Sequence, residues 1–134
     1  RLEDGTAVRL VAVHPRPPEP IRDQDAKPRD AELIVVGRTL DEAGPAVIAG
    51  DLNDVAWSAT TTLFRRVSGL LDPRRGRGMY NSWNARNPLF RFPLDHVFHS
   101  NHFRLVELRR LGNVGSDHFP MLIELSHEPD APLE

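Results

Sequence analysis

Polar side chains that could do chemistry recur where the apolar runs of this sequence end. Asp51 and Asn53 directly follow the apolar run of residues 46–50. Residues two apart in an extended chain point to the same side, so a carboxylate and a neutral amide converge there. The carboxylate can hold a divalent cation or orient a water, and the amide can donate a hydrogen bond to a phosphoryl oxygen. The alternative is an Asx turn that caps the following helix.

A second candidate is Asp95, in the segment LDHVF. A carboxylate inside an otherwise apolar strand is costly, so Asp95 should pair with a cation, a histidine or several hydrogen-bond donors. His96 alternates with Asp95 and faces the other way, which favours a packed or surface histidine. His99 and His102 have the same interpretation.

The third candidate is the segment GSDHFP, where a glycine turn presents Asp117 and His118 at the start of the last expected strand. Their side chains can serve one site only if the backbone turns there; otherwise the segment is an ordinary turn. All three motifs offer oxygen ligands or imidazoles at strand ends. This set suits Mg²⁺ or Mn²⁺ and phosphoryl chemistry.

The elements around these motifs indicate an α/β (α+β) chain. Apolar alternation predicts a strand over residues 8–13, buried on both faces, and the prolines that follow place His14 at its carboxyl end. Helical spacing predicts a helix over residues 30–41 and an apolar run predicts a strand over 46–50. This β-α-β order puts His14 and Asp51 at the carboxyl ends of their strands.

The second part of the chain is expected to be richer in strands. Ser58 can cap a helix that extends to about residue 67, and residues 69–87 have a loop-like composition. Further strands are predicted over residues 92–99, 103–111 and 119–125. We expect one domain, or part of one, over residues 1–126, followed by an acidic tail over residues 127–134.

Composition narrows the classes of protein. The chain has 134 residues, 40% of them hydrophobic, with 17 Lys+Arg against 19 Asp+Glu and no cysteine. Thiol nucleophiles, zinc–thiolate sites and disulfides are therefore excluded. No apolar run approaches the ~20 residues of a membrane-spanning helix, and the charge balance argues against a broad basic surface for nucleic acid.

Four segments together resemble one family. VAVHP at residues 11–15, GDLN at 50–53, LDHVFHS at 94–100 and GSDHFP at 115–120 are similar, in this order and spacing, to the C-terminal half of the endonuclease/exonuclease/phosphatase family, which has the fold of pancreatic deoxyribonuclease. The resemblance extends from Val8 to about Leu125. It implies half of a four-layer α/β/β/α sandwich, a mixed sheet with flanking helices. The residues around His14 and Asp95 also resemble those of a bacterial subgroup that often carries N-terminal membrane helices.

The resemblance implies a metal-dependent phosphoesterase that hydrolyses a phosphate ester with a metal-assisted water. The catalytic residues would be His14, Asp51, Asn53, Asp95 and His118. Asp51 would orient or deprotonate the water, Asn53 and His14 would bind the phosphate or leaving group, and His118 would lie beside the phosphorus, paired with Asp95. Asp117 and Asp51 would be metal ligands for Mg²⁺ or Mn²⁺.

The family's metal-binding Glu and an early Asn precede the strand that ends here at His14. The chain is therefore expected to be a fragment that is inactive alone and supplies mainly one sheet, whose apolar face the missing N-terminal half or a second copy covers. Nucleic acid, phospholipid and inositol phosphate all stay open as substrates. A non-catalytic module that binds a phosphorylated ligand or a protein in the same cleft is the alternative.

Overall fold

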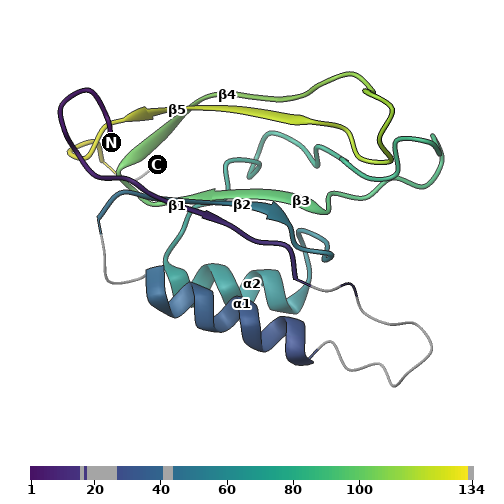
Figure 1. The fold of residues 1–134 in the computed structure, drawn as a ribbon, viewed down its shortest axis with the longest axis horizontal. Helices are drawn as coiled ribbons and strands as arrows, with labels where there is room; N and C mark the ends of the chain where they lie inside the picture. The colour runs from purple at the N-terminus through teal and green to yellow at the C-terminus, as the bar shows by residue number, and fades with distance from the viewer. Residues whose placement is uncertain (16, 18–26, 41–43, 133–134) are drawn as a thin grey trace.

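The structure is a computed structural model that describes residues 1–15, 17, 27–40 and 44–132. Its elements run in the order β1 (Arg9–Ala12), α1 (Lys27–Leu40), β2 (Ala46–Asp51), α2 (Ala59–Ser68), β3 (Asp95–His99), β4 (Phe103–Arg110) and β5 (Met121–His127). In Figure 1 they form three layers, with both helices below one sheet and a second sheet above it. No helix among the described residues is long and apolar enough to cross a membrane.

The central layer is a mixed sheet in the order β1-β2-β3. β1 pairs with β2 in parallel and β2 pairs with β3 antiparallel. The predicted β-α-β unit is therefore present as β1-α1-β2. The mixed α+β class and the flanking helices predicted from the sequence are confirmed.

The upper layer is a two-stranded antiparallel sheet of β4 and β5. The expectation that the chain supplies mainly one sheet is wrong. The described residues contribute strands to both sheets, because the two apolar stretches after His99 pair with each other and not with β3. One apolar face of the central sheet thus lies toward another part of the same chain (Figure 1).

The core lies between the helices and the central sheet. It contains eight buried apolar residues: Leu33, Leu40, Ala46, Ile48, Leu52, Phe64, Leu70 and Phe98. Gly37 lets the helices approach closely, since a Cβ there would lie 3.2 Å from the Phe64 ring. Both ends of α2 are capped by residues that favour this role. Ser58 at the N-terminus accepts a hydrogen bond from Thr61 N, and Gly69 at the C-terminus adopts the left-handed conformation that ends the helix.

Several predicted boundaries differ from the structure. β1 is not buried on both faces: Leu10 and Ala12 are exposed and Val11 is half-buried. β1 is an edge strand of the described sheet, with β2 as its one described neighbour. β3 begins at Asp95 and not at residue 92. β5 begins at Met121, because Phe119 and Pro120 belong to the preceding loop, and it runs to His127. Asp41, where we expected α1 to end, lies outside the described residues.

Candidate active site

Two carboxylates face each other across the central sheet. Asp51 ends β2, Asp95 begins β3, and the two residues are partners in the antiparallel register. The sequence suggested that Asp95 is buried inside an apolar strand. Instead it is the first residue of β3, and its side chain is 26% exposed. Two neighbouring negative charges repel each other, so a cation or an imidazolium between them would stabilise the pair.

His118 supplies that group. Its Nδ1 lies 2.7 Å from Asp95 Oδ2, and its Nε2 lies 3.7 Å from Asp51 Oδ2. Partial burial disfavours the imidazolium, but the hydrogen bond to Asp95 and the charges of Asp95, Asp51 and Asp117 outweigh it, so the pKa of His118 is raised. A protonated His118 can donate from Nδ1 to Asp95 and present Nε2–H to an anion.

His14 reaches the same carboxylate from the other side. Its Nε2 lies 3.8 Å from Asp51 Oδ2, and its side chain is 74% exposed. Gly50 makes this approach possible: Val13 N donates to Ala49 O, and a Cβ on Gly50 would lie 1.8 Å from Val13 O. Only glycine therefore lets the chain before His14 lie so close to the end of β2.

Asn53 lies in the predicted turn. Its backbone N–H donates to Asp51 Oδ1 at 2.8 Å, which is the Asx turn that we gave as an alternative. The turn does not cap α2, however, because Ser58 is the N-cap. The Asn53 side chain donates from Nδ2 to Pro15 O at 2.9 Å, and so ties this turn to the segment after His14.

Asp117 lies on the exposed loop between β4 and β5. Its Oδ2 accepts a long hydrogen bond of 3.4 Å from Trp83 Nε1, and its backbone carbonyl accepts one from Ala85 N at 2.7 Å. The pKa of Asp117 is lowered, chiefly by hydrogen bonding to a backbone N–H. Contacts with the 83–85 segment thus fix the position of Asp117 on this loop.

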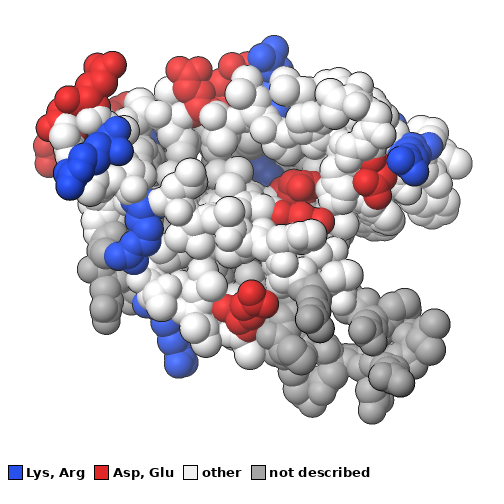
Figure 2. All heavy atoms as spheres, viewed as in Figure 1, with Lys and Arg blue, Asp and Glu red and all other residues white. Residues whose placement is uncertain are grey.

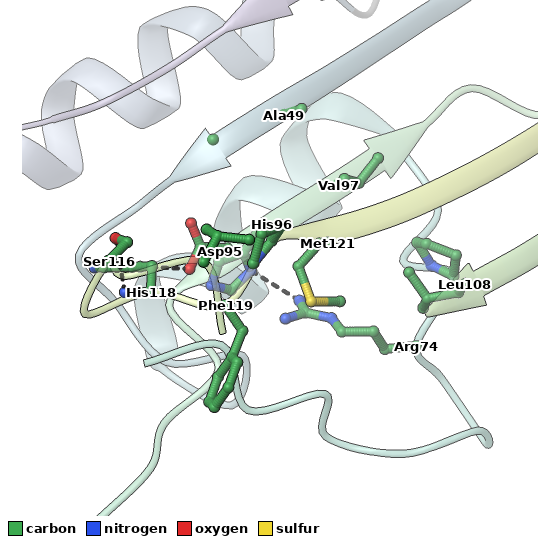
Figure 3. Close-up of a pocket in the computed structure, with 14 residues that line it drawn as sticks. Ala49, Arg74, Asp95, His96, Val97, Leu108, Ser116, His118, Phe119 and Met121 are labelled. Atoms are coloured by element: carbon green, nitrogen blue, oxygen red, sulfur yellow. Dashed lines mark hydrogen bonds and ion pairs between the residues drawn. The ribbon is translucent and has the colours of Figure 1, made fainter. Parts of the chain in front are cut away.

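A cavity of about 370 Å³ opens between the two sheets beside this cluster. Asp95 and His118 line it together with apolar side chains, among them Val97, Leu108 and Met121. Figure 3 shows Asp95, His118 and Ser116 grouped on one side of this cavity, while Arg74 approaches from another. On the face drawn in Figure 2, carboxylates gather in a hollow toward the right of the molecule.

A buried chain of hydrogen bonds supports the Asp51 turn from behind. Asp72 accepts from Arg74 Nε at 3.0 Å and from Nη2 at 2.9 Å, and Arg74 Nη2 also lies 2.8 Å from His96 Nδ1. Since Nδ1 accepts from the guanidinium, Nε2 of His96 carries the proton and donates to Asp54 O at 2.8 Å. Burial and the neighbouring Arg74 lower the pKa of His96 to about 4, so this histidine is neutral near pH 7.

Sequence reasoning assigned no role to this chain of contacts. His96 was expected to be a packed or surface histidine, and it is indeed buried. Arg74 belongs to the arginine-rich segment of residues 74–77, and it is buried (6% exposed) and paired with Asp72. The signal available was the Asp-x-Arg spacing, typical of a local turn that pairs the two charges.

The donor set can be tested against a divalent ion. Asp51 and Asp117 offer the hard oxygen atoms that Mg²⁺ and Mn²⁺ prefer, and Mg²⁺ is often held by one or two carboxylates together with water and substrate phosphate. Within the described ranges, no group of three or more His, Asp or Glu side chains could hold a metal ion together. The donor chemistry fits such an ion, with few ligands from this part of the chain.

A family model for the Endonuclease/Exonuclease/phosphatase family matches residues 1–118. The chain therefore belongs to this family, in agreement with the resemblance of its four segments. None of the curated proteins compared with the chain is similar to it at a significant level.

Solved structures share the fold. An endonuclease/exonuclease/phosphatase from Beutenbergia cavernae superimposes with a TM-score of 0.67 at 19% identity, over 89% of this chain and 36% of that one. D. rerio TDP2 complexed with single-strand DNA product gives 0.64 at 19% identity, over 87% and 55%. A mannosyl-6-phosphatase from Bacteroides thetaiotaomicron gives 0.58 at 21% identity, over 75% and 46%. At these identities the comparisons establish the fold, and this chain spans about half or less of each.

Proposed function

We propose that the protein hydrolyses phosphate esters with the help of a divalent cation, Mg²⁺ or Mn²⁺. The observation that carries the proposal is the position of Asp51 between two imidazoles, with His118 held by Asp95. A phosphate anion needs hydrogen-bond donors and positive charge, and a water nucleophile needs a carboxylate beside it. This cluster has both kinds of group within about 4 Å of one oxygen atom.

Each side chain has a proposed task. His118, protonated because of Asp95, donates from Nε2 to a phosphoryl oxygen, and His14 does the same on the exposed side of Asp51. Asp51 orients the attacking water and accepts its proton. Asn53 fixes the turn and places its amide beside the phosphate. The cation, held by Asp51 and Asp117, would polarise the phosphoryl oxygens.

We also propose that this chain acts as part of a larger unit. The matched region covers only 36%, 46% and 55% of the three structures compared above. Leu10 and Ala12 expose apolar surface on β1, and the described residues provide few metal ligands. An N-terminal segment, or a second copy, would cover this surface and supply a further carboxylate. The chain alone is then inactive or nearly so.

The fold indicates only the chemical class of the substrate, a phosphate ester. Among the structural neighbours, one is bound to DNA and another is a sugar phosphatase, so diesters and monoesters are both candidates. The open cavity beside His118 accommodates a leaving group larger than a hydroxyl. A nucleic acid, a phospholipid or an inositol phosphate would each satisfy this requirement.

The test is hydrolysis of bis-p-nitrophenyl phosphate and p-nitrophenyl phosphate with Mg²⁺ or Mn²⁺. It should use both the 134-residue chain and a version extended to the length of the matched structures. Asp51→Asn and His118→Gln should each lower kcat by a factor of about 10² or more, as expected for groups that act in general acid–base catalysis. Asp130→Asn, an exposed carboxylate in the C-terminal segment, is the matched control.

Turnover that EDTA abolishes and that depends on Asp51 and His118 would support the proposal. Equal turnover in all variants would contradict it. Phosphate-ester binding without any turnover by the extended version would instead favour the non-catalytic binding module.

A further inference from the structure

A basic groove of about 680 Å³ lies on the flank of the molecule, beyond β3. We call it the arginine groove. Its charged lining consists of Arg65, Arg75, Arg77, Arg104 and Asp72. Four positive side chains and one negative therefore surround it, in a chain whose net charge is −2. A surplus of this kind, set against the overall charge, attracts an anion locally.

The single carboxylate of the groove is already neutralised. Asp72 forms a two-point ion pair with Arg74, and both side chains are buried. Asp72 still acts on Arg65 through its charge, but its hydrogen-bonding oxygen atoms are engaged by Arg74. Arg77 and Arg104 donate to backbone carbonyl oxygens, so they contribute positive charge more than open donors.

Arg65 has a buried hydrogen-bond donor, Nε, without an acceptor among the described residues. Burial, together with the nearby positive charges of Arg75 and Arg74, lowers the pKa of Arg65 despite the opposing charge of Asp72. A buried donor without a partner costs free energy, and an anion that accepted this hydrogen bond would remove the cost.

The groove is separate from the Asp51–His118 cluster. His99, which lines the groove, is the last residue of β3, whereas Asp95 is the first. At ~3.3 Å per residue, the length of β3 places them roughly 13 Å apart. A smaller cavity of about 340 Å³ shares Arg65, Arg75 and Arg77 with the groove and adds the exposed Trp57.

We propose that the arginine groove binds the phosphate groups of a multiply charged anion at a second site, apart from the catalytic cluster. Arginine presents a planar fork of donors that matches phosphate oxygens, and several guanidinium groups around one groove favour an anion with more than one charge. Arg65 and Arg75 provide the donors. The same chemistry is found in free diphosphate and in a phosphodiester backbone, and in the second case a base could stack on Trp57.

The test is isothermal titration of the 134-residue chain with sodium pyrophosphate and, separately, with a twelve-residue oligothymidylate. The buffer should contain EDTA, so that no cation bridges the ligand to Asp51, and chloride should hold the ionic strength constant. Wild-type protein should bind at least one of the two probes saturably, with one site. Arg65→Gln and Arg75→Gln should each weaken binding by at least about tenfold, since each removes a charge-assisted hydrogen bond.

Arg66→Gln is the matched control. Arg66 follows Arg65 on α2, has the same charge and is exposed, but lines neither cavity. Its substitution should change the dissociation constant by less than about twofold. Circular dichroism checks that Arg65→Gln and Arg75→Gln are both folded, and Arg75 lies in an exposed loop.

Pyrophosphate binding without oligothymidylate binding would support the site with a free anion as its ligand. Tighter binding of oligothymidylate, reduced by Trp57→Ala, would support the site with a phosphodiester backbone. No saturable binding of either probe, or an equal loss in Arg66→Gln, would overturn the proposal. None of these measurements depends on hydrolysis. Failure of the arginine groove to bind an anion would therefore leave the proposed phosphoesterase activity untouched, and absence of that activity would leave the arginine groove untouched.

Discussion

At the scale of single residues, the cluster is organised around the proton on His118. Asp95 holds Nδ1, and Asp51 and Asp117 add negative charge nearby, so the imidazolium is favoured despite partial burial. The charge state of one histidine thus depends on three carboxylates that the sequence places in three different segments.

Asp95→Asn should lower the pKa of His118 relative to wild type, because the variant replaces a charged hydrogen-bond acceptor with a neutral one. Two-dimensional NMR of the imidazole resonances as a function of pH measures this shift. Glu107→Gln, which removes a carboxylate paired with Arg109 on β4, should leave the titration of His118 unchanged. A His118 pKa that is the same in Asp95→Asn and wild type would contradict the pairing.

The raised pKa of His118 also makes the stability of the fold depend on pH. Because the folded pKa of His118 is raised, its imidazolium stabilises the fold fully below its unfolded pKa of about 6.5. That contribution is lost as the pH rises through the folded pKa. The stability of wild type relative to His118→Gln should therefore fall on going from mildly acidic to alkaline pH.

The lowered pKa of His96 gives the opposite dependence of stability on pH. Its folded pKa of about 4 lies below the unfolded value of 6.5, so its neutral form stabilises the fold above about pH 6.5, and this contribution is lost as the pH falls toward 4. The loss is of the order of 3 kcal/mol at most. His96→Gln can accept from Arg74 and donate to Asp54 O without titrating, so urea unfolding of this variant should show a flatter dependence on pH.

At the scale of elements, the close approach of β1 and β2 positions the cluster. Gly50→Ala would place a methyl group 1.8 Å from Val13 O, so the two strands would have to separate. We expect a loss of several kcal/mol in the free energy of unfolding, in the range typical of strong steric conflict, and a displaced His14. Gly112→Ala, where a Cβ meets nothing within 4 Å, should be nearly neutral. Urea denaturation compares the two variants, and similar midpoints would contradict this interpretation.

The elements also show what the sequence could and could not predict. Helical spacing, the Ser58 cap and the β-α-β order were sufficient for α1, α2 and the β1-α1-β2 unit, because these depend on local sequence signals, whereas the mixed sheet was implied by the family resemblance. The pairing of β4 with β5 in a separate sheet was not predicted, since the partner of a strand is decided by long-range packing. The neighbourhood of Asp51, Asp95 and His118 came from a family resemblance. The Asp72–Arg74–His96 chain was missed because its members contact one another through buried side chains that leave no periodic trace.

At the scale of the whole molecule, the two interfaces between layers differ in how well they are closed. The helix–sheet interface contains Phe64, Ile48 and Phe98, each almost completely buried. On the second sheet, Met121, Ile123 and Leu125 are only half-buried. Stability should therefore reside mainly in the helix–sheet layer.

Phe64→Ala should cost about 3–5 kcal/mol, as expected for a large side chain removed from a closed core. Leu125→Ala should cost distinctly less, because Leu125 still contacts solvent in the folded state. Equilibrium unfolding in urea measures both, with Ile48→Val as a control that should cost about 0.5–1.5 kcal/mol. Equal costs for Phe64→Ala and Leu125→Ala would show that the second layer is as tightly packed as the first.

The marginal position of β1 sets the order in which the cluster comes apart. β1 is joined to β2 over only four residue pairs, and its outer face is largely exposed, whereas β3 is anchored by Phe98 in the core. Short, exposed strands open at a lower free energy than the rest of a domain. Transient detachment of β1 would carry His14 away while Asp51, Asp95 and His118 stay together. The cluster would then exist in a complete and an incomplete form that exchange without global unfolding, and whatever packs against β1 would control how often both imidazoles are in place.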